Sequence, residues 1–125
     1  MCRIICFTDT GAVASTVEAT LGDHDLYLLS ATRLTADVRD LVQRLAPDVV
    51  LLELTRALDN AHLFFFLRSD QVTRDTPVIL VSPSDFTTHH ADILEADSVL
   101  GHATLADHLS STVARLMPKA RAVGF

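Results

Sequence analysis

The stretch PDVVLLELTR, residues 47–56, decides the fold class of this chain. It holds a run of branched apolar residues at positions 49–52, followed by a single carboxylate at Glu53. A strand that is apolar on both faces is typical of a parallel sheet covered by helices on both sides. Ligands bind at the carboxyl ends of the strands in such a sheet, so an acid at that end is a candidate functional group.

Four other apolar runs flank this stretch and alternate with segments of helical periodicity. The runs predicted as strands are RIICF, DLYLLS, DVVLLEL, TPVILVS and SVLGH, at residues 3–7, 25–30, 48–54, 76–82 and 98–102. Apolar residues at three- and four-residue spacing predict helices at residues 11–22, 35–47, 59–71, 85–96 and 105–117. The alternation predicts one α/β domain, residues 1–117, in which right-handed helical crossovers join parallel strands. Pro118 is predicted to end the last helix, which leaves residues 118–125 as a tail or the start of a linker.

The composition argues against several classes of function. The 125 residues are 49% hydrophobic and 21% charged, which is ordinary for a packed globular core. A net charge of -6 offers no basic surface to a phosphate backbone, so direct nucleic-acid binding is not expected. No apolar run approaches the roughly 20 residues of a membrane-spanning helix, and Asp9 comes too early for a signal peptide. Because the spacing of Cys2 and Cys6 suits neither a zinc site nor a disulfide framework, a soluble cytoplasmic protein is predicted.

Reactive side chains stand at the predicted carboxyl ends of four strands. Thr8 and Asp9 follow the first strand, and Glu53 closes the third. Ser82 closes the fourth strand and His102 the fifth. Because the carboxyl ends of parallel strands meet at one edge of a sheet, these groups are predicted to converge there.

Three strings in the chain resemble the receiver domain of two-component response regulators. LAPDVVLLELT resembles the family's phosphoacceptor strand, TRDTPVILVS its step into a switch hydroxyl, and ADHLSSTVARLM its last helix. The likeness covers residues 3–117. It implies a doubly wound, flavodoxin-like sheet of five parallel strands in the order 2-1-3-4-5. It also implies a role in signal transduction and binding to protein partners.

Carried over position by position, the resemblance places altered residues in the phosphorylation site. Glu53 stands where the family has its phosphorylated aspartate. Thr8 and Asp9 stand where it has a pair of magnesium-binding acids. The positions of the switch Ser/Thr, the switch aromatic residue and a lysine fall on Ser82, Val99 and His102.

These departures predict a degenerate, or pseudo-, receiver without aspartyl-phosphate chemistry. Phosphoryl transfer depends on positioning and on charge neutralisation by a metal and cationic groups. The lost acid at Thr8 and the extra methylene at Glu53 both weaken an octahedral magnesium site, and the imidazole of His102 replaces a fixed cation. Binding of Mg²⁺ is therefore expected to be weak, at Asp9 and Glu53, or lost. No other cofactor and no enzymatic activity are expected.

Several readings of this site stay open. The charge of Glu53, bonded to Ser82 or paired with His102, locks an active-like state in one reading; in the other, Glu53 is a residual acid in a solvated cleft. A phosphoreceiver that keeps cation or phosphoryl binding at Asp9 and Glu53 is one alternative function. A flavodoxin-like small-ligand binder is another, although TDTGAVAS lacks a glycine-rich phosphate loop.

The string HLFFFLR predicts a surface for protein partners. Leu63, Phe64 and Leu67 have the spacing of sheet-facing residues, which leaves Phe65 and Phe66 on the helix exterior. Exposed aromatic residues are favoured anchors in interfaces. The alternative is that one of the two packs against a neighbouring helix.

Histidines in the last third of the chain extend the candidate patch. Besides His102 these are His89, His90 and His108. They fall on the surface where receiver domains commonly dimerise or dock partners, although solvated histidines with no role fit the sequence as well. The function predicted from the whole sequence is a phosphorylation-independent protein-protein interaction module in signalling, with a homodimer as one form of association.

Overall fold

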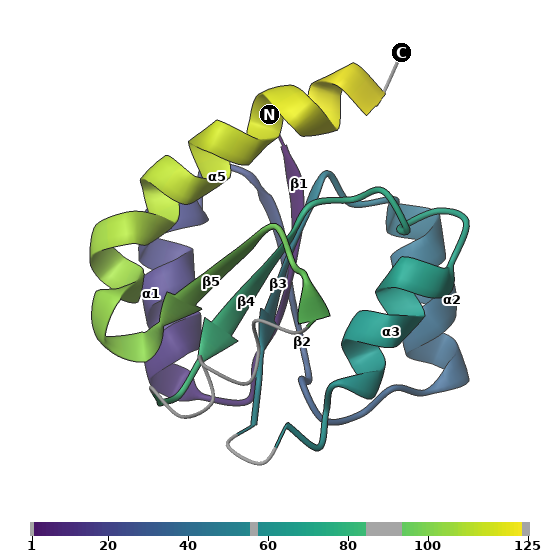
Figure 1. Ribbon diagram of the computed structural model, residues 1–125, viewed down its shortest axis with the longest axis horizontal. Helices are drawn as coiled ribbons and strands as arrows, with labels where there is room; N and C mark the ends of the chain where they lie inside the picture. The colour runs from purple at the N-terminus through teal and green to yellow at the C-terminus, as the bar shows by residue number, and fades with distance from the viewer. Residues whose placement is uncertain (1, 56–57, 85–93, 124–125) are drawn as a thin grey trace.

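Five parallel strands form a single sheet in the order β2-β1-β3-β4-β5 (Figure 1). The computed structural model describes residues 2–55, 58–84 and 94–123, with side chains as far as Met117. The strands are β1 (Arg3–Phe7), β2 (Asp25–Leu29), β3 (Val49–Glu53), β4 (Val78–Ser82) and β5 (Ser98–Gly101). The predicted doubly wound sheet and its strand order are confirmed.

Strand β3 lies in the middle of the sheet, and all five of its residues are buried. It pairs with β1 on one side and with β4 on the other, where Glu53 stands opposite Val81. Successive side chains enter opposite cores, Leu51 on one face and Leu52 on the other. This two-sided burial explains why the strand is apolar throughout, and it makes the single acid at its end conspicuous.

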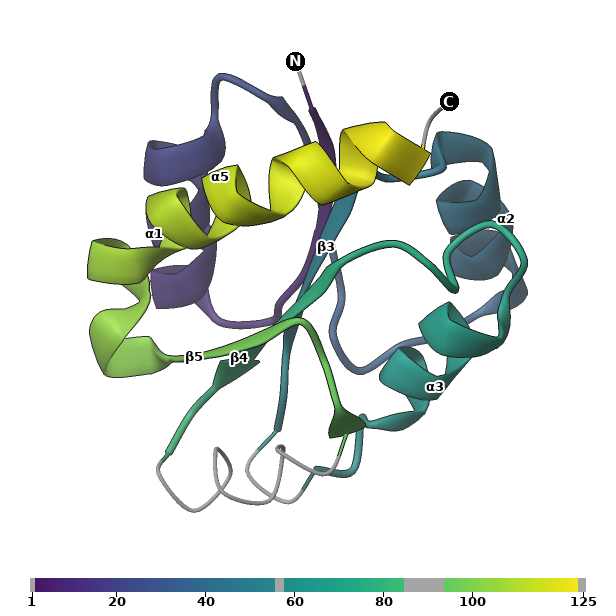
Figure 2. The same cartoon turned by 45° about the horizontal axis from the view of Figure 1, so that its top comes forward.

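Helices cover both faces of the sheet (Figures 1 and 2). One face carries α1 (Gly11–Leu21) and α5 (Leu105–Val123), whose residues Val17 and Leu109 lie in the same core cluster. The other face carries α2 (Ala36–Leu45) and α3 (His62–Ser69), joined in a second cluster through Val42 and Leu63. A short 3-10 helix, η2 (His102–Thr104), connects β5 to α5. The helices thus form two layers, one on each face of the sheet.

Capping residues fix the ends of α2. The hydroxyl of Thr35 accepts a hydrogen bond from the N–H of Val38, and Asp37 places a negative charge in the first turn. At the other end Ala46 adopts the left-handed conformation, with φ of 45°, and its N–H bonds the carbonyl of Val42. The chain can therefore turn into β3 after only two further residues, Pro47 and Asp48.

The last helix is longer than predicted. α5 continues to Val123, so the prediction that Pro118 ends it is wrong. Proline inside a helix removes one backbone hydrogen bond and lowers stability, but its fixed φ is helical, so the chain can remain helical beyond it. The helix predicted at residues 85–96 lies mostly outside the described residues. Neither α5 nor any other helix in the described ranges is long and apolar enough to cross a membrane.

Candidate functional site

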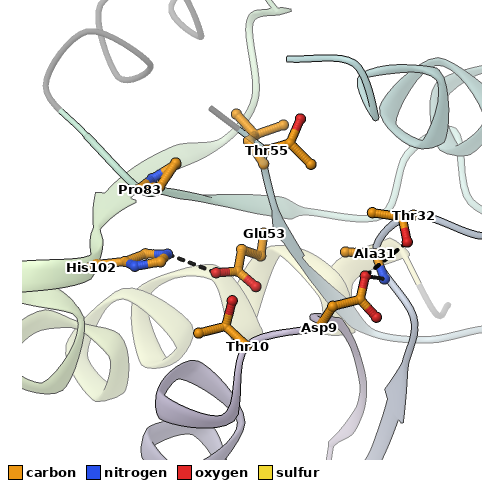
Figure 3. A pocket seen from close by; sticks show the side chains of 9 residues that line it. Asp9, Thr10, Ala31, Thr32, Glu53, Thr55, Pro83 and His102 are labelled. Carbon is orange, nitrogen blue, oxygen red and sulfur yellow. Dashed lines mark hydrogen bonds and ion pairs between the residues drawn. The ribbon is translucent and has the colours of Figure 1, made fainter. Parts of the chain in front are cut away.

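Glu53 lies at the carboxyl edge of the sheet with both oxygens of its carboxylate engaged. The hydroxyl of Thr8 donates a hydrogen bond to Oε1 over 2.6 Å. Nε2 of His102 lies 2.8 Å from Oε2 (Figure 3). Only 6% of Glu53 is exposed to solvent, so its charge depends on these two neighbours for compensation. The sequence predicted either Ser82 or His102 as a partner of this carboxylate. It pairs with His102 and not with Ser82.

The three residues come from three different strands. Thr8 directly follows β1, Glu53 is the last residue of β3, and His102 directly follows β5. Parallel strands bring these ends to one edge, as the sequence predicts. His102 remains partly accessible, with 34% of its side chain exposed, whereas Glu53 lies beneath it.

Asp9 lies at the same edge but points to a different partner. Its Oδ2 accepts hydrogen bonds from the N–H of Ala31 over 3.1 Å and from the hydroxyl of Thr32 over 3.0 Å. Figure 3 shows its carboxylate turned toward this loop after β2. The two acids therefore border one pocket, but they have different hydrogen-bond partners and do not share one.

The pocket between them has a volume of about 310 Å³. Hydroxyl, carboxylate and imidazole groups make up most of its polar lining. The lining residues are Asp9, Thr10, Ala31, Thr32, Glu53, Leu54, Thr55, Pro83 and His102. No Lys or Arg occurs among these described lining residues, so His102 is the one of them that can carry a positive charge.

The residues at this edge do not fit a magnesium ion. Mg²⁺ requires near-octahedral oxygen ligands and is usually held by more than one carboxylate. Here the hydroxyl of Thr8 donates a hydrogen bond to Glu53, and the carboxylate of Asp9 accepts hydrogen bonds from the loop after β2. Within the described part of the chain, no group of three or more His, Cys, Asp or Glu side chains is placed to hold a metal ion.

Ser82 is fully buried. Its hydroxyl donates to the backbone carbonyl of Ser84 over 2.8 Å, within the loop that follows β4. Val99, at the switch aromatic position, is partly buried and packs against the core cluster beneath α2 and α3. The hydroxyl of Ser82 and the side chain of Val99 are thus both engaged in local contacts.

The negative charge of Glu53 affects the pKa of a thiol in the core. Burial raises the pKa of Cys6 on β1 from 9.0 to about 12, and the negative charge of Glu53 contributes to the rise. Cys2 is buried as well. A thiol in this environment stays protonated and unreactive near neutral pH.

Asn60 is a structural residue of the site that the sequence reasoning missed. Only 2% of its surface is exposed to solvent. Its amide donates to the carbonyl of Glu53 and to that of Ala31, each over 2.8 Å, and its oxygen accepts the N–H of Thr55. One side chain thereby joins the end of β3, the loop after β2 and the approach to α3. An asparagine shortly before an apolar helix was the available signal.

The two candidate aromatic residues on α3 have different environments. Phe65 is 56% exposed, and its ring meets Phe64 edge to face at 5.9 Å between centroids. Phe66 is partly buried against the core under α2, and the guanidinium of Arg39 lies 5.7 Å from its ring centroid. Phe66 therefore packs against the neighbouring helix, which was the alternative considered for one of the two. His108 is exposed on α5, whereas His89 and His90 lie outside the described residues.

No protein-family model and no curated protein matches the chain. Solved structures do. The receiver domain of a signal transduction histidine kinase from Syntrophus aciditrophicus aligns with a TM-score of 0.73 and 19% identity over 95% of this chain and 92% of that one. A CheY-like protein, TadZ, from Pseudomonas aeruginosa PAO1 aligns with a TM-score of 0.75 and 14% identity over 93% and 99%.

A sensor protein from Polaromonas sp. JS666 is also similar, with a TM-score of 0.72 and 20% identity over 94% of this chain and 97% of that chain. At these identities the likeness defines the fold and no more. The alignments cover nearly all of each pair of chains, which agrees with the strand order and with the layers of helices described above. The chain has the fold of a CheY-like receiver domain.

Proposed function

We propose that this chain is a pseudo-receiver that acts as a phosphorylation-independent protein-protein interaction module in signal transduction. The observation that carries the proposal is the engagement of Glu53, whose carboxylate is bonded to Thr8 and His102. These are the positions at which the resemblance places a magnesium-binding acid and a lysine. The groups that would bind a metal and a phosphoryl group are instead bonded to one another.

This arrangement is unfavourable for phosphoryl transfer. A carboxylate that attacks phosphorus needs a free oxygen, a metal to neutralise the incoming charge and a cation beside the transferred group. Both oxygens of Glu53 have a partner, and Asp9 is bonded to Ala31 and Thr32. A phosphoryl donor would have to displace these contacts and would meet two carboxylates without a bound metal.

The surface around Phe65 supports an interaction role. An aromatic side chain that is 56% exposed on a helix is an anchor that protein partners commonly use. It stands on α3, whose opposite face is fixed in the core by Leu63 and Leu67. A partner could therefore contact Phe65 without disturbing the fold. A second copy of the chain is one candidate partner.

Exposure to a phosphoryl donor tests the proposal. The wild-type chain is incubated with Mg²⁺ and a small-molecule acyl phosphate, and its intact mass is measured. We expect no phosphoryl adduct. The matched control is a variant that carries Thr8→Asp, Glu53→Asp and His102→Lys together, which rebuilds the altered positions on the same scaffold and is expected to gain an adduct. A hydroxylamine-labile adduct on Glu53 of the wild-type chain would overturn the proposal.

A further inference from the structure

A chain of contacts joins the ends of three strands across the carboxyl edge. Thr8 bonds Oε1 of Glu53 and His102 contacts Oε2, so that β3 is tied to β1 and to β5 at once. Strand β4 lies between β3 and β5 in the sheet. The contact from Glu53 to His102 therefore passes over the end of β4 and does not involve its last residue, Ser82.

Each end of this chain leads directly into a helix. The hydroxyl of Thr8 also accepts the N–H of Thr10 over 3.1 Å, and Thr10 is the N-cap of α1. His102 is the first residue of η2, which runs without a break into α5 at Leu105. The N-terminal ends of α1 and α5 are thus held at fixed positions relative to Glu53.

The two helices form one layer on the same face of the sheet. Val13 and Val17 of α1 share a core cluster with Leu105 and Leu109 of α5. Figure 2 shows α5 lying beside α1 along this face. A contact that fixes the starts of both helices therefore affects a continuous layer of the molecule.

Strand β4 takes no part in these contacts. The hydroxyl of Ser82 is committed to the carbonyl of Ser84 over 2.8 Å, and the side chain has no exposed surface. A change at Glu53 can reach the helical layer through Thr8 and His102 by direct hydrogen bonds.

We infer that Thr8, Glu53 and His102 form a fixed latch that couples the centre of the sheet to α1 and α5 and bypasses β4. A buried carboxylate that loses one of its partners is left with uncompensated charge, so removal of either partner is unfavourable beyond the bond itself. The latch extends the proposed function, and a role of the latch in signalling rests on that proposed function. With the latch closed, the α1 and α5 layer holds one arrangement without any phosphoryl group.

Hydrogen exchange of backbone amides tests the latch in the intact chain. His102→Ala removes one partner of Glu53 at a partly exposed position, and Thr8→Val removes the other with little change in shape. We expect His102→Ala to speed exchange in the first turns of α5 by about tenfold, as expected for a lost bond worth about 1.4 kcal/mol. Thr8→Val should do the same at the start of α1. The amides of α2 serve as the reference for global unfolding.

Two further variants decide between a latch and a general loss of stability. His102→Lys keeps a donor beside Glu53 and should restore slow exchange in α5. Ser82→Ala removes a hydroxyl of the same edge that does not contact Glu53 and should leave the exchange of α1 and α5 unchanged relative to α2. Equal exchange in wild type and His102→Ala, or the same acceleration in Ser82→Ala, would overturn the latch. Phosphorylation of wild type would overturn the proposed function and leave these exchange results standing.

Discussion

A buried carboxylate keeps its charge only when neighbouring groups compensate it, and Glu53 has two such neighbours. Its side chain is one methylene longer than that of aspartate, which extends the carboxylate to a position between the hydroxyl of Thr8 and the imidazole of His102. Thr8 is therefore more than a lost metal ligand. A hydroxyl can donate a hydrogen bond to Glu53, whereas a second ionised carboxylate at this position would repel it.

The thiol of Cys6 gives a pH-dependent prediction at the same scale. Its pKa is about 12 in the folded chain, against 9.0 as the ordinary value. A raised pKa in the folded state means that the associated stability is complete below about pH 9 and is lost as the pH rises toward about 12, because the unfolded chain releases the proton first. The free energy of unfolding should fall by about 1.4 kcal/mol per pH unit in this window from this group.

Urea unfolding of wild type and of Cys6→Ala across this pH window measures the effect. The variant loses the titrating group, so its stability should fall less steeply with pH, although it is less stable throughout because of the cavity. Other groups titrate in both chains and cancel in the comparison. Equal slopes would mean that the thiol of Cys6 ionises as readily in the folded chain as in the unfolded one.

At the scale of elements, α3 places two adjacent aromatic residues in different environments, although the sequence pattern puts both on the helix exterior. Phe65→Arg changes a side chain that is 56% exposed, and we expect the free energy of unfolding to stay within about 0.5 kcal/mol of wild type. Phe66→Arg removes a ring that packs toward α2 under Arg39, and we expect a loss of about 1–2 kcal/mol. Urea unfolding of the two single variants measures both values.

Any test of partner binding at this surface should therefore use Phe65→Arg alone, because a variant that also carries Phe66→Arg would combine lost binding with lost stability. Ser69→Arg, on an exposed position one turn further along α3, is a matched control for the added charge. If Phe65→Arg destabilises the chain more than Phe66→Arg does, the assignment of the two rings to surface and core is wrong.

The helices and strands also show which features the sequence could predict. β1 and β3 were predictable because their apolar runs are unbroken, and α2 because Thr35 and Asp37 mark its start. The end of α5 was not, since Pro118 is a strong local signal for termination and the helix nevertheless continues. A proline inside a helix lowers stability but does not by itself decide whether the helix continues past it.

At the scale of the whole molecule, the strand order brings Thr8, Glu53 and His102 together although they are 45 or more residues apart in sequence. Their convergence was predictable from the rule that the carboxyl ends of parallel strands share an edge. The orientation of each side chain was not. Asp9 turns to Ala31, and Asn60 reaches Glu53, because of loop conformations that sequence periodicity does not describe.

The fold alone does not determine whether the chain is a phosphorylation switch, because folds of this kind carry different functions at the same edge. We propose that three side chains decide this question here. A scaffold with Asp, Asp and Lys at these positions would offer ligands to a metal and a cation to a phosphoryl group, whereas Thr8, Glu53 and His102 bond one another. We propose that this internal pairing replaces ligand binding.

Backbone amide NMR of the wild-type chain, titrated with Mg²⁺ and then with beryllofluoride as a mimic of an acyl phosphate, tests that claim most directly. We predict no saturable shifts at Asp9, Glu53, Ser82 or His102, while the variant with Thr8→Asp, Glu53→Asp and His102→Lys responds to the same additions. Saturable shifts at these positions in wild type would contradict the account, because they would show that the edge still binds a cation and a phosphoryl-like group.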